Sequence, residues 1–593
     1  MAQPGSALVW GASGRRFKSG RPDQILQGNV NVEKIWLKSY SKGVPAEIDP
    51  DSHSSIVEML DASCKVHKDL PAFYSLGVTL TFRQVDEYAR ALAAYFQNTL
   101  KLKKGDRVAI MLPNVLQYPI VMFAILRAGL IAVNVNPLYT APELVHQVND
   151  AGVETIIVLS NFAHTVQKAL PETQLKNILV TDIGDLFPQP KAFFINFVVK
   201  HIKKKVPAWL IPGSVPLKKA LDAGKSLTLQ PVPIVNTDVA FLQYTGGTTG
   251  VSKGAVLTHR NLIANITQAE AWFHPSFKDG QETILTALPL YHIFSLTANC
   301  LFLMKIGGLN VLIINARDTD QVIAEMKKFK FTILTAVNTL FHAMLKHPKF
   351  AQLDFSHLKV SLGGGMAVQS TVADKWHMVT GNVLLEAYGL TETSPCACIN
   401  PINLARYNGT VGLPVPSTDV AILDDDHQPL PVGEQGEIAI KGPQVMRGYW
   451  NNAAETQKVF SADGWLLTGD IGMMNEQGFV RVLERKKDMI LVSGFNVYPN
   501  EIEDVLVSME GIREAAVVAV KDENAGEVPK AFVVRENPEL TVEDITAFCR
   551  TKLTGYKIPK HIKFCDELPK TNVGKVMRRA LRQDDVAVVK PNL

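Results

Sequence analysis

A glycine-rich and hydroxyl-rich loop between two apolar runs is the first stretch of this 593-residue chain whose composition suggests chemistry. Residues 244–254 read YTGGTTGVSKG. The glycines leave backbone amides accessible, and the hydroxyls and the Lys253 ammonium add donors, so the loop is suited to bind polyphosphate. It is not a Walker P-loop, because Lys253 follows Ser252 and precedes another glycine. We predict a polyphosphate clamp of another kind, and a flexible β-turn is the plainer alternative.

Polar groups in apolar or glycine-rich settings recur further along the chain. His292 lies in LPLYHIF, where a core histidine is the plainer interpretation. The segments SLGGGM (361–366) and EAYGLTET (386–393) contain glycines that allow a planar base or an acyl chain to approach the backbone. Asp470 ends GWLLTGD and can accept hydrogen bonds from two vicinal hydroxyls. Lys575 lies in PKTNVGKV, where a solvated surface lysine is the alternative.

The elements that must position these groups alternate between strands and helices. Buried strands are predicted at 107–112, 130–136, 155–160 and 177–182. A helix opens at Thr140, with Glu143 as its capping-box partner, and ends near Gly152. The glycine-rich loop lies between strands at 239–243 and 255–259, and a helix follows the Thr258 cap, so no helix N-terminus points at the loop. This alternation predicts a layered α/β fold with mainly parallel sheets.

After Arg485 the pattern changes to a small α+β module. We predict a helix over 500–511 with Asn500 as cap and Glu503 as box partner, strands at 515–520 and 530–535, a helix opened by Thr541, and a strand at 562–566. A chain of this length exceeds a single core. We therefore predict a large N-terminal domain at 32–485 and a small C-terminal domain at 486–593. Residues 1–31 match neither, and we interpret them as a disordered extension or as sequence upstream of a translation start near Val32.

Composition narrows the function classes. A net charge of +4 over the whole chain gives no reason to expect nucleic acid as a partner. The six cysteines show no CxxC spacing and suit a reducing cytosol. The most apolar stretch, residues 118–135, is interrupted by Arg127 and Gly129, and we interpret it as a buried helix and strand rather than a membrane span.

A basic amphipathic segment stands apart from this pattern. Residues 193–212 read FFINFVVKHIKKKVPAWLIP, in which bulky apolar residues adjoin Lys200, Lys203, Lys204 and Lys205, with Trp209 nearby. Such a segment can lie on an anionic membrane surface. A helix with a solvated lysine face is the equally weighted alternative.

The motifs, in this order, resemble those of the adenylate-forming superfamily of acyl-CoA synthetases, luciferases and peptide-synthetase adenylation domains. The resemblance is closest to bacterial long-chain fatty-acyl-CoA synthetases and extends from Val32 to the end. It implies a large domain of layered α/β subdomains and a small mobile α+β domain. The segment 463–487 is similar to the family's fatty-acyl signature but departs from it at Leu467, Met474, Glu476 and Glu484, none of which we assign to phosphate chemistry.

The resemblance implies that a fatty carboxylate attacks ATP to form an acyl-adenylate with loss of pyrophosphate, and that the thiol of coenzyme A then displaces AMP. Lys575, Glu392 and His292 would be catalytic, with Lys575 at the reacting carboxylate, and His292 and Phe294 at the inner end of the acyl pocket. Lys487 would be the hinge and Gly494 would line the coenzyme A passage. Glu392 and Thr248 would hold Mg²⁺. ATP would be bound by Tyr244, Thr245, Gly246, Gly247, Thr248, Thr249, Gly250, Lys253, Gly364, Gly365, Glu386, Ala387, Tyr388, Thr391, Asp470 and Arg485.

Two other functions are weighed against a long-chain fatty-acid:CoA ligase. One is a medium-chain or aryl acid:CoA ligase of the same superfamily, and the other is a receptor that binds nucleotide or lipid without catalysis. The presence of Glu392, Asp470, Arg485 and Lys575 disfavours the receptor. We expect a cytoplasmic enzyme in peripheral contact with the inner face of the cell membrane. Family members are often dimers, which makes a homodimer an expectation as well.

Overall fold

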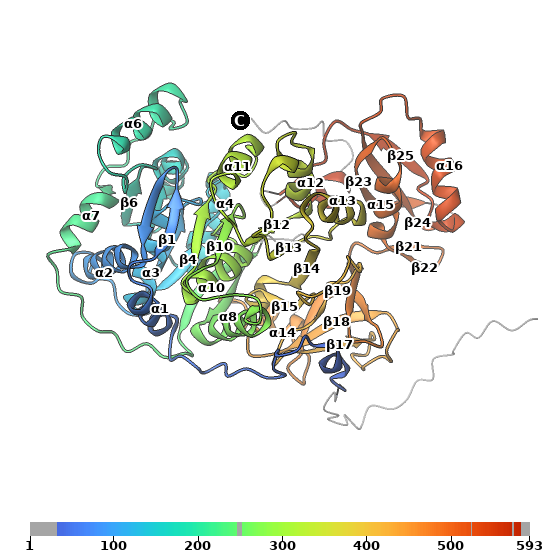
Figure 1. Ribbon diagram of the computed structural model, residues 1–593, viewed down its shortest axis with the longest axis horizontal. Coiled ribbons are helices and arrows are strands. Elements are labelled where there is room, and N and C mark those ends of the chain that lie inside the picture. Colours follow the sequence, from blue (N-terminus) through green and yellow to red (C-terminus); the bar gives the residue numbers. More distant parts are fainter. Residues whose placement is uncertain (1–31, 246–251, 523–524, 572–573, 583–593) are drawn as a thin grey trace, which may run out of the picture. The chain divides into compact units, whose positions relative to one another are not determined.

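The strands predicted between residues 107 and 182 form the centre of a seven-stranded sheet in the computed structural model, which describes residues 32–245, 252–522, 525–571 and 574–582 (Figure 1). In spatial order the strands are β7 (Val215–Pro216), β6 (Asn177–Thr181), β5 (Thr155–Leu159), β3 (Arg107–Met111), β4 (Ile131–Asn134), β8 (Val239–Thr245) and β9 (Lys253–Thr258). Neighbours pair in parallel except β8 and β9, which are antiparallel and flank the glycine-rich loop. The predicted arrangement of strand, loop and strand is confirmed.

A second, nine-stranded sheet carries the other glycine-rich motifs. Its order is β16 (Leu413–Pro414), β15 (Cys396–Ile399), β14 (Leu384–Gly389), β13 (Val360–Gly364), β12 (Ile333–Ala336), β10 (Thr283–Thr286), β11 (Leu309–Leu312), β1 (Pro71–Ser75) and β2 (Val78–Thr81). The central strands are parallel, so the carboxyl ends of β13 and β14 meet at one edge, with Gly364 opposite Ala387. Ligands of parallel sheets bind at such edges.

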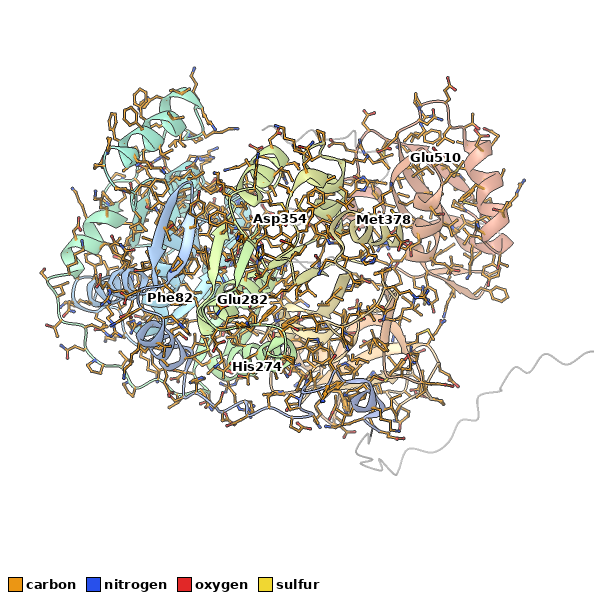
Figure 2. The ribbon with its side chains drawn as sticks, viewed as in Figure 1. Phe82, His274, Glu282, Asp354, Met378 and Glu510 are labelled. Atoms are coloured by element: carbon orange, nitrogen blue, oxygen red, sulfur yellow. The ribbon has the colours of Figure 1, made fainter. Side chains whose placement is uncertain are left out.

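Helices cover both sheets, and side chains fill the space between the layers (Figure 2). They are α1 (Ile56–Val66), α2 (Phe82–Asn98), α3 (Gln117–Arg127), α4 (Ala141–Ala151), α5 (Ala163–Ala169), α6 (Lys191–Phe197), α7 (Leu217–Gly224), α8 (His259–Phe273), α9 (Ile293–Ser295), α10 (Phe302–Lys305), α11 (Thr319–Met326), α12 (Asn338–Lys346) and α13 (Ser370–Thr380). The capping box at the start of α4 is confirmed, since the Thr140 main-chain N–H donates to Glu143 at 2.8 Å. The layered α/β class is therefore confirmed.

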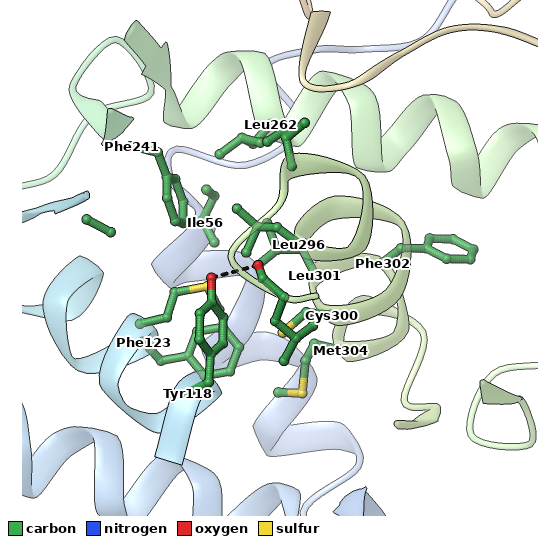
Figure 3. Packing of buried hydrophobic residues seen from close by; sticks show 14 of the residues in the cluster. Ile56, Tyr118, Phe123, Phe241, Leu262, Leu296, Cys300, Leu301, Phe302 and Met304 are labelled. Carbon is green, nitrogen blue, oxygen red and sulfur yellow. Dashed lines mark hydrogen bonds between the residues drawn. The ribbon is translucent and has the colours of Figure 1, made fainter. Parts of the chain in front are cut away.

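The apolar stretch at 118–135 is a core helix and strand, as predicted. The whole of α3 is buried, and Tyr118 donates a hydrogen bond to the Leu290 main-chain oxygen at 2.8 Å inside the main core cluster (Figure 3). Of the helices in the described part of the chain, none is long and apolar enough to cross a membrane.

A four-stranded antiparallel sheet follows and brings Asp470 opposite Arg485. It consists of β17 (Asp419–Leu423), β18 (Gly436–Lys441), β19 (Leu466–Met474) and β20 (Val480–Arg485), with α14 (Ala453–Val459) between β18 and β19. Asp470 and Arg485 thus face each other on two consecutive, paired strands.

The C-terminal module contains the two predicted helices, α15 (Pro499–Ser508) and α16 (Val542–Lys552), and the three predicted strands, β23 (Ile512–Asp522), β24 (Gly526–Arg535) and β25 (His561–Phe564). It also contains three elements that were not predicted, β21 (Ile490–Val492), β22 (Phe495–Val497) and α17 (Arg578–Arg582). The capping box of Thr541 and Asp544 opens α16. Contacts group the described chain from Val32 onward into one unit, so the domain boundary after residue 485 stays a prediction. Residues 1–31 lie outside the described residues.

Two local predictions in this module are wrong. The strand at 562–566 ends at Phe564. Asn500 is not the cap of α15, because the helix begins at Pro499 and Tyr498 occupies the cap position, where its side chain makes no capping hydrogen bond. Proline favours the first helical position, where its missing N–H is not needed, and this places the start one residue earlier. Asn500 and Glu503 bind other groups instead, which are described below.

Candidate active site

One cavity of about 2120 Å³ collects most of the residues predicted to carry chemistry. Those that line it are Tyr244, Thr245, Lys253, His292, Gly364, Gly365, Glu386, Ala387, Tyr388, Thr391, Glu392, Asp470, Arg485, Lys487 and Lys575. The predicted loop residues Gly246, Gly247, Thr248, Thr249 and Gly250 lie outside the described residues. Gly494 is not part of the lining; it occupies the turn between β21 and β22 at φ +86°.

The ends of the glycine-rich loop are held by β8 and β9, in which Thr245 pairs with Lys253. The Lys253 ammonium forms an ion pair with Glu455 of α14 and lies 5.2 Å from the centre of the Tyr449 ring. The two ends of the loop therefore lie at the cavity, and the ion pair with Glu455 holds the Lys253 ammonium there.

Glu392 also faces this part of the cavity. The Tyr449 hydroxyl donates to Glu392 Oε1 at 2.6 Å, and burial raises the pKa of Tyr449, so the phenol stays protonated. This hydrogen bond orients the carboxylate. In the described part of the chain, no group of three or more histidine, cysteine or acidic residues is placed to hold a metal ion by itself.

Asp470, Arg485 and Tyr388 form a buried polar group on the same wall. Asp470 is 3% exposed; its Oδ1 accepts from Arg485 Nε at 2.7 Å and its Oδ2 accepts from the Tyr388 hydroxyl at 2.6 Å. Burial raises the pKa of Asp470, and the Arg485 charge acts in the opposite direction. Two donors thus fix the orientation of a carboxylate that faces the cavity.

The carboxyl ends of β13 and β14 leave room beside this group. A β-carbon at Gly364 would lie 2.9 Å from the Phe294 ring, so only glycine allows this approach. Glu386 is 5% exposed and accepts hydrogen bonds from the Val368 main-chain N–H at 2.8 Å and from the Tyr407 hydroxyl at 2.9 Å. Burial raises the pKa of Glu386 to about 7. Its oxygens are used to hold the edge of the sheet together.

Lys575 reaches into the cavity from the loop before α17. A β-carbon at Gly365 would lie 3.8 Å from Lys575 Cε, which places the lysine over the glycine-rich edge. Across residues 32–245, 252–522, 525–571 and 574–582, no carboxylate lies within 4 Å of its ammonium. Burial, reinforced by the Arg485 charge, lowers the pKa of Lys575. The surface-lysine alternative is therefore excluded by position, since the side chain lines the cavity.

An apolar part of the cavity begins at His292 and Phe294. Burial, together with the Lys575 charge, lowers the pKa of His292 to about 4, so the imidazole is neutral near pH 7. Phe302 belongs to the main core cluster, where its ring points away from Tyr118 (Figure 3), and the centroids of the Phe277 and Phe302 rings are 6.2 Å apart. The apolar residues that line the cavity include Ala269, Phe273, Phe277, Ala298, Phe302, Ile333, Val360 and Leu362.

Several of these residues were missed in the sequence. Tyr449 contacts Glu392 across 57 residues, and Tyr407 contacts Glu386 across 21. No local pattern marks such partners, and Phe273, the aromatic residue that α8 contributes to the lining, has the spacing of an ordinary core helix.

Comparisons with known proteins show the family of this chain. A family model for AMP-binding enzymes matches residues 60–450, and one for the AMP-binding enzyme C-terminal domain matches residues 501–575. A long-chain-fatty-acid–CoA ligase of Yersinia pestis is 52% identical over 94% of this chain and 99% of its own length. One of Bacillus subtilis is 38% identical with the same coverage. The crystal structure of ATP-bound MatB from Rhodopseudomonas palustris has a TM-score of 0.77 at 26% identity, covering 89% of this chain and 98% of that one. The chain therefore belongs to the AMP-binding enzyme family.

Proposed function

We propose that this protein joins a long-chain fatty acid to coenzyme A at the expense of ATP, through an acyl-adenylate. The observation that carries this proposal is the single cavity that combines the Lys575, Arg485 and Glu392 charges with an apolar part lined by aromatic rings. A fatty acid needs both environments, one for its carboxylate and one for its chain. The curated relatives of Yersinia pestis and Bacillus subtilis, both long-chain-fatty-acid–CoA ligases, support the same substrates.

In the first half-reaction a carboxylate oxygen attacks the α-phosphorus of ATP, and the bond to the pyrophosphate oxygen breaks. Two anions must approach each other, so fixed cations are the main contribution of the protein. Lys575 would neutralise the fatty carboxylate and the α-phosphate, while Lys253 would exchange Glu455 for the departing pyrophosphate. Asp470 and Arg485 would hold the ribose, with the base against Tyr388. Neutral His292 lets the carboxylate pass without trapping it in a second ion pair.

The residues present fit a Mg²⁺ ion that arrives with ATP. Mg²⁺ is commonly bound by one or two carboxylates together with substrate phosphates, and Glu392 offers one oriented carboxylate at the phosphate end of the cavity. When bound, Mg²⁺ would neutralise phosphate charge. Glu392 would hold it, and Thr248, outside the described residues, would be the other protein ligand.

For the second half-reaction we propose that the small domain turns about Lys487. The thiol of coenzyme A then attacks the acyl carbonyl, and the bond to AMP breaks. Gly494 faces open space in the turn after β21, and rotation would bring this turn to the cavity to line the passage for coenzyme A. This assignment treats 32–485 and 486–593 as the two moving parts.

The proposed substrate class is tested by pyrophosphate release with a panel of acids, with and without coenzyme A. We expect turnover with palmitate and oleate, weaker turnover with octanoate, and little with benzoate, because only a long chain fills the apolar part of the cavity. Preference for octanoate or benzoate would favour the medium-chain or aryl alternative. If no acid led to pyrophosphate release, the result would support a binding protein instead.

We also propose that α6 and the π-helix Val198–Ile202 that follows it contact an anionic membrane surface. Their apolar side chains are exposed: Phe193 by 62%, Phe194 by 59%, Phe197 by 45% and Ile202 by 65%. Lys200, Lys203, Lys204 and Lys205 are exposed beside them, whereas Trp209 packs against an internal cluster instead. Apolar side chains next to lysines suit the boundary between acyl chains and anionic headgroups.

Reversing two of these charges should release the protein from vesicles. Lys203→Glu/Lys204→Glu is expected to lower affinity for phosphatidylglycerol vesicles at least tenfold, because each lysine near such a surface contributes about 1 kcal/mol. The matched control is Lys218→Glu/Lys219→Glu, which changes two exposed lysines of α7. Cosedimentation measures both. Equal binding of the two variants, or no binding of the wild type, would contradict membrane contact through α6.

A further inference from the structure

A buried carboxylate that the proposed chemistry does not use lies near the end of β20. Glu484 is 1% exposed and directly precedes Arg485. A buried carboxylate is unfavourable unless donors satisfy it. Its oxygens accept hydrogen bonds from the main-chain N–H groups of Arg485 at 2.8 Å and Asn500 at 3.0 Å. They also accept one from the Arg578 guanidinium at 3.1 Å.

Arg578 links this carboxylate to the loop that carries Lys575. It begins α17, three residues after Lys575. Its guanidinium also donates to Asn500 Oδ1 at 2.8 Å and to Glu503 at 2.8 and 2.9 Å. The loop is closed by the Thr571 N–H, which donates to the Lys575 main-chain oxygen at 2.7 Å. One guanidinium therefore anchors the short loop from which the Lys575 side chain enters the cavity.

These contacts divide into two groups about the proposed hinge, Lys487. Glu484 precedes the hinge in sequence, whereas Asn500, Glu503 and Arg578 follow it. A rotation about the hinge separates Glu484 from Arg578 and from the Asn500 main chain, whereas the Arg485 N–H stays with Glu484. The pair of Arg578 and Glu503 has both members on the same side and moves as a unit.

We propose that Glu484 is a positioning residue, which acts through Arg578 to hold Lys575 in the cavity during adenylate formation and releases it when the small domain turns. This inference rests on the proposed function, in which Lys575 serves the first half-reaction only. In this proposal Glu484 acts through Arg578 and not on a substrate. A positioning role requires that loss of its charge affects the two half-reactions unequally, whereas a merely structural role requires equal losses.

The test compares Glu484→Gln with the matched variant Glu503→Gln, which makes the same change against the same guanidinium without crossing the hinge. Adenylate formation by Glu484→Gln should fall roughly tenfold or more, as expected for loss of a charge-assisted hydrogen bond. Thioester formation from supplied acyl-adenylate should stay within about twofold of wild type or become faster, because this contact must open. Glu503→Gln should keep the wild-type ratio of the two rates. Equal losses in both steps for Glu484→Gln, or the same change of ratio in both variants, would overturn the proposal.

Hydrogen exchange of the full chain without substrates provides a readout that does not depend on activity. Residues 574–582 should exchange faster in Glu484→Gln than in Glu503→Gln or wild type, and unchanged exchange would overturn the proposal. Arg578→Gln removes the guanidinium that binds Glu484 and should also speed exchange of these residues. This variant serves as the test if Glu484→Gln does not fold. A wild type without ligase activity would refute the proposed function, whereas the exchange result would still decide whether Glu484 holds the loop.

Discussion

Lys575→Ala should abolish acyl-adenylate formation while leaving thioester formation from supplied acyl-adenylate within a few-fold of wild type. The side chain lines the cavity over Gly365, and no carboxylate of the described residues neutralises its ammonium within 4 Å. Its charge is therefore available to two reacting anions. Removing one such group aimed at developing charge typically lowers a rate by roughly a hundredfold or more.

The two half-reactions are measured separately. Exchange of pyrophosphate with ATP in the presence of fatty acid reports the first, and conversion of prepared acyl-adenylate with coenzyme A reports the second. Lys552→Ala, an exposed lysine of α16, is the control for the loss of a positive charge from the small domain and should leave both rates unchanged. Equal loss of both half-reactions in Lys575→Ala would contradict the assignment.

The pH dependence of the first half-reaction checks the same assignment. Burial, and then the Arg485 charge, lower the pKa of Lys575, and the cation is present only below that pKa. As pH rises, adenylate formation should therefore decline before the pH reaches the ordinary lysine value of about 10.4. Lys575→Arg remains charged and should lose this alkaline decline in whatever activity it retains. The same decline in both proteins would show that another group titrates.

Local patterns predicted most of the fold because the strands are self-contained signals. Residues Thr155–Leu159 read TIIVL and are buried on both faces, as a central parallel strand requires. The helix starts at Thr140, Thr258 and Thr541 each carry a capping box that needs only neighbouring residues. The prediction that Asn500 caps α15 was wrong because a proline directly precedes it and starts the helix one residue earlier. In addition, Glu484 and Arg578, which are distant in sequence, form hydrogen bonds with Asn500.

The sequence motifs predicted the residues that face the cavity, but they did not predict the residues that orient them. Each motif named the residue that faces the cavity, such as Glu392 or Lys253. Glu392 is oriented by Tyr449, which precedes α14, and Lys253 by Glu455 of α14. No local sequence pattern marks Tyr449 or Glu455 as partners of these residues. The apolar lining is hidden for a related reason, since Phe273 and Phe302 are equally suited to a closed core.

Asp470→Asn should weaken ATP binding at least tenfold, the second large effect expected here. One carboxylate accepts from both Arg485 and Tyr388, and an asparagine can accept from only one of them while its NH₂ group faces the other donor. The guanidinium then loses its counter-charge in a partly buried site, where an unpaired charge is costly. Isothermal titration calorimetry with ATP in the absence of fatty acid measures the loss directly, and a thermal melt reports any accompanying destabilisation.

Tyr388→Phe separates the two donors, because it removes the 2.6 Å hydrogen bond to Asp470 and leaves the ion pair with Arg485 intact. A neutral hydrogen bond contributes roughly 1 kcal/mol, so this variant should lose only a few-fold in ATP affinity. If Asp470→Asn bound ATP as tightly as Tyr388→Phe, the carboxylate would serve only to tie β19 to β14. If instead Asp470→Asn alone lost the affinity without a lower melting temperature, the charge itself would be what ATP requires, as the proposed contact with the ribose hydroxyls demands.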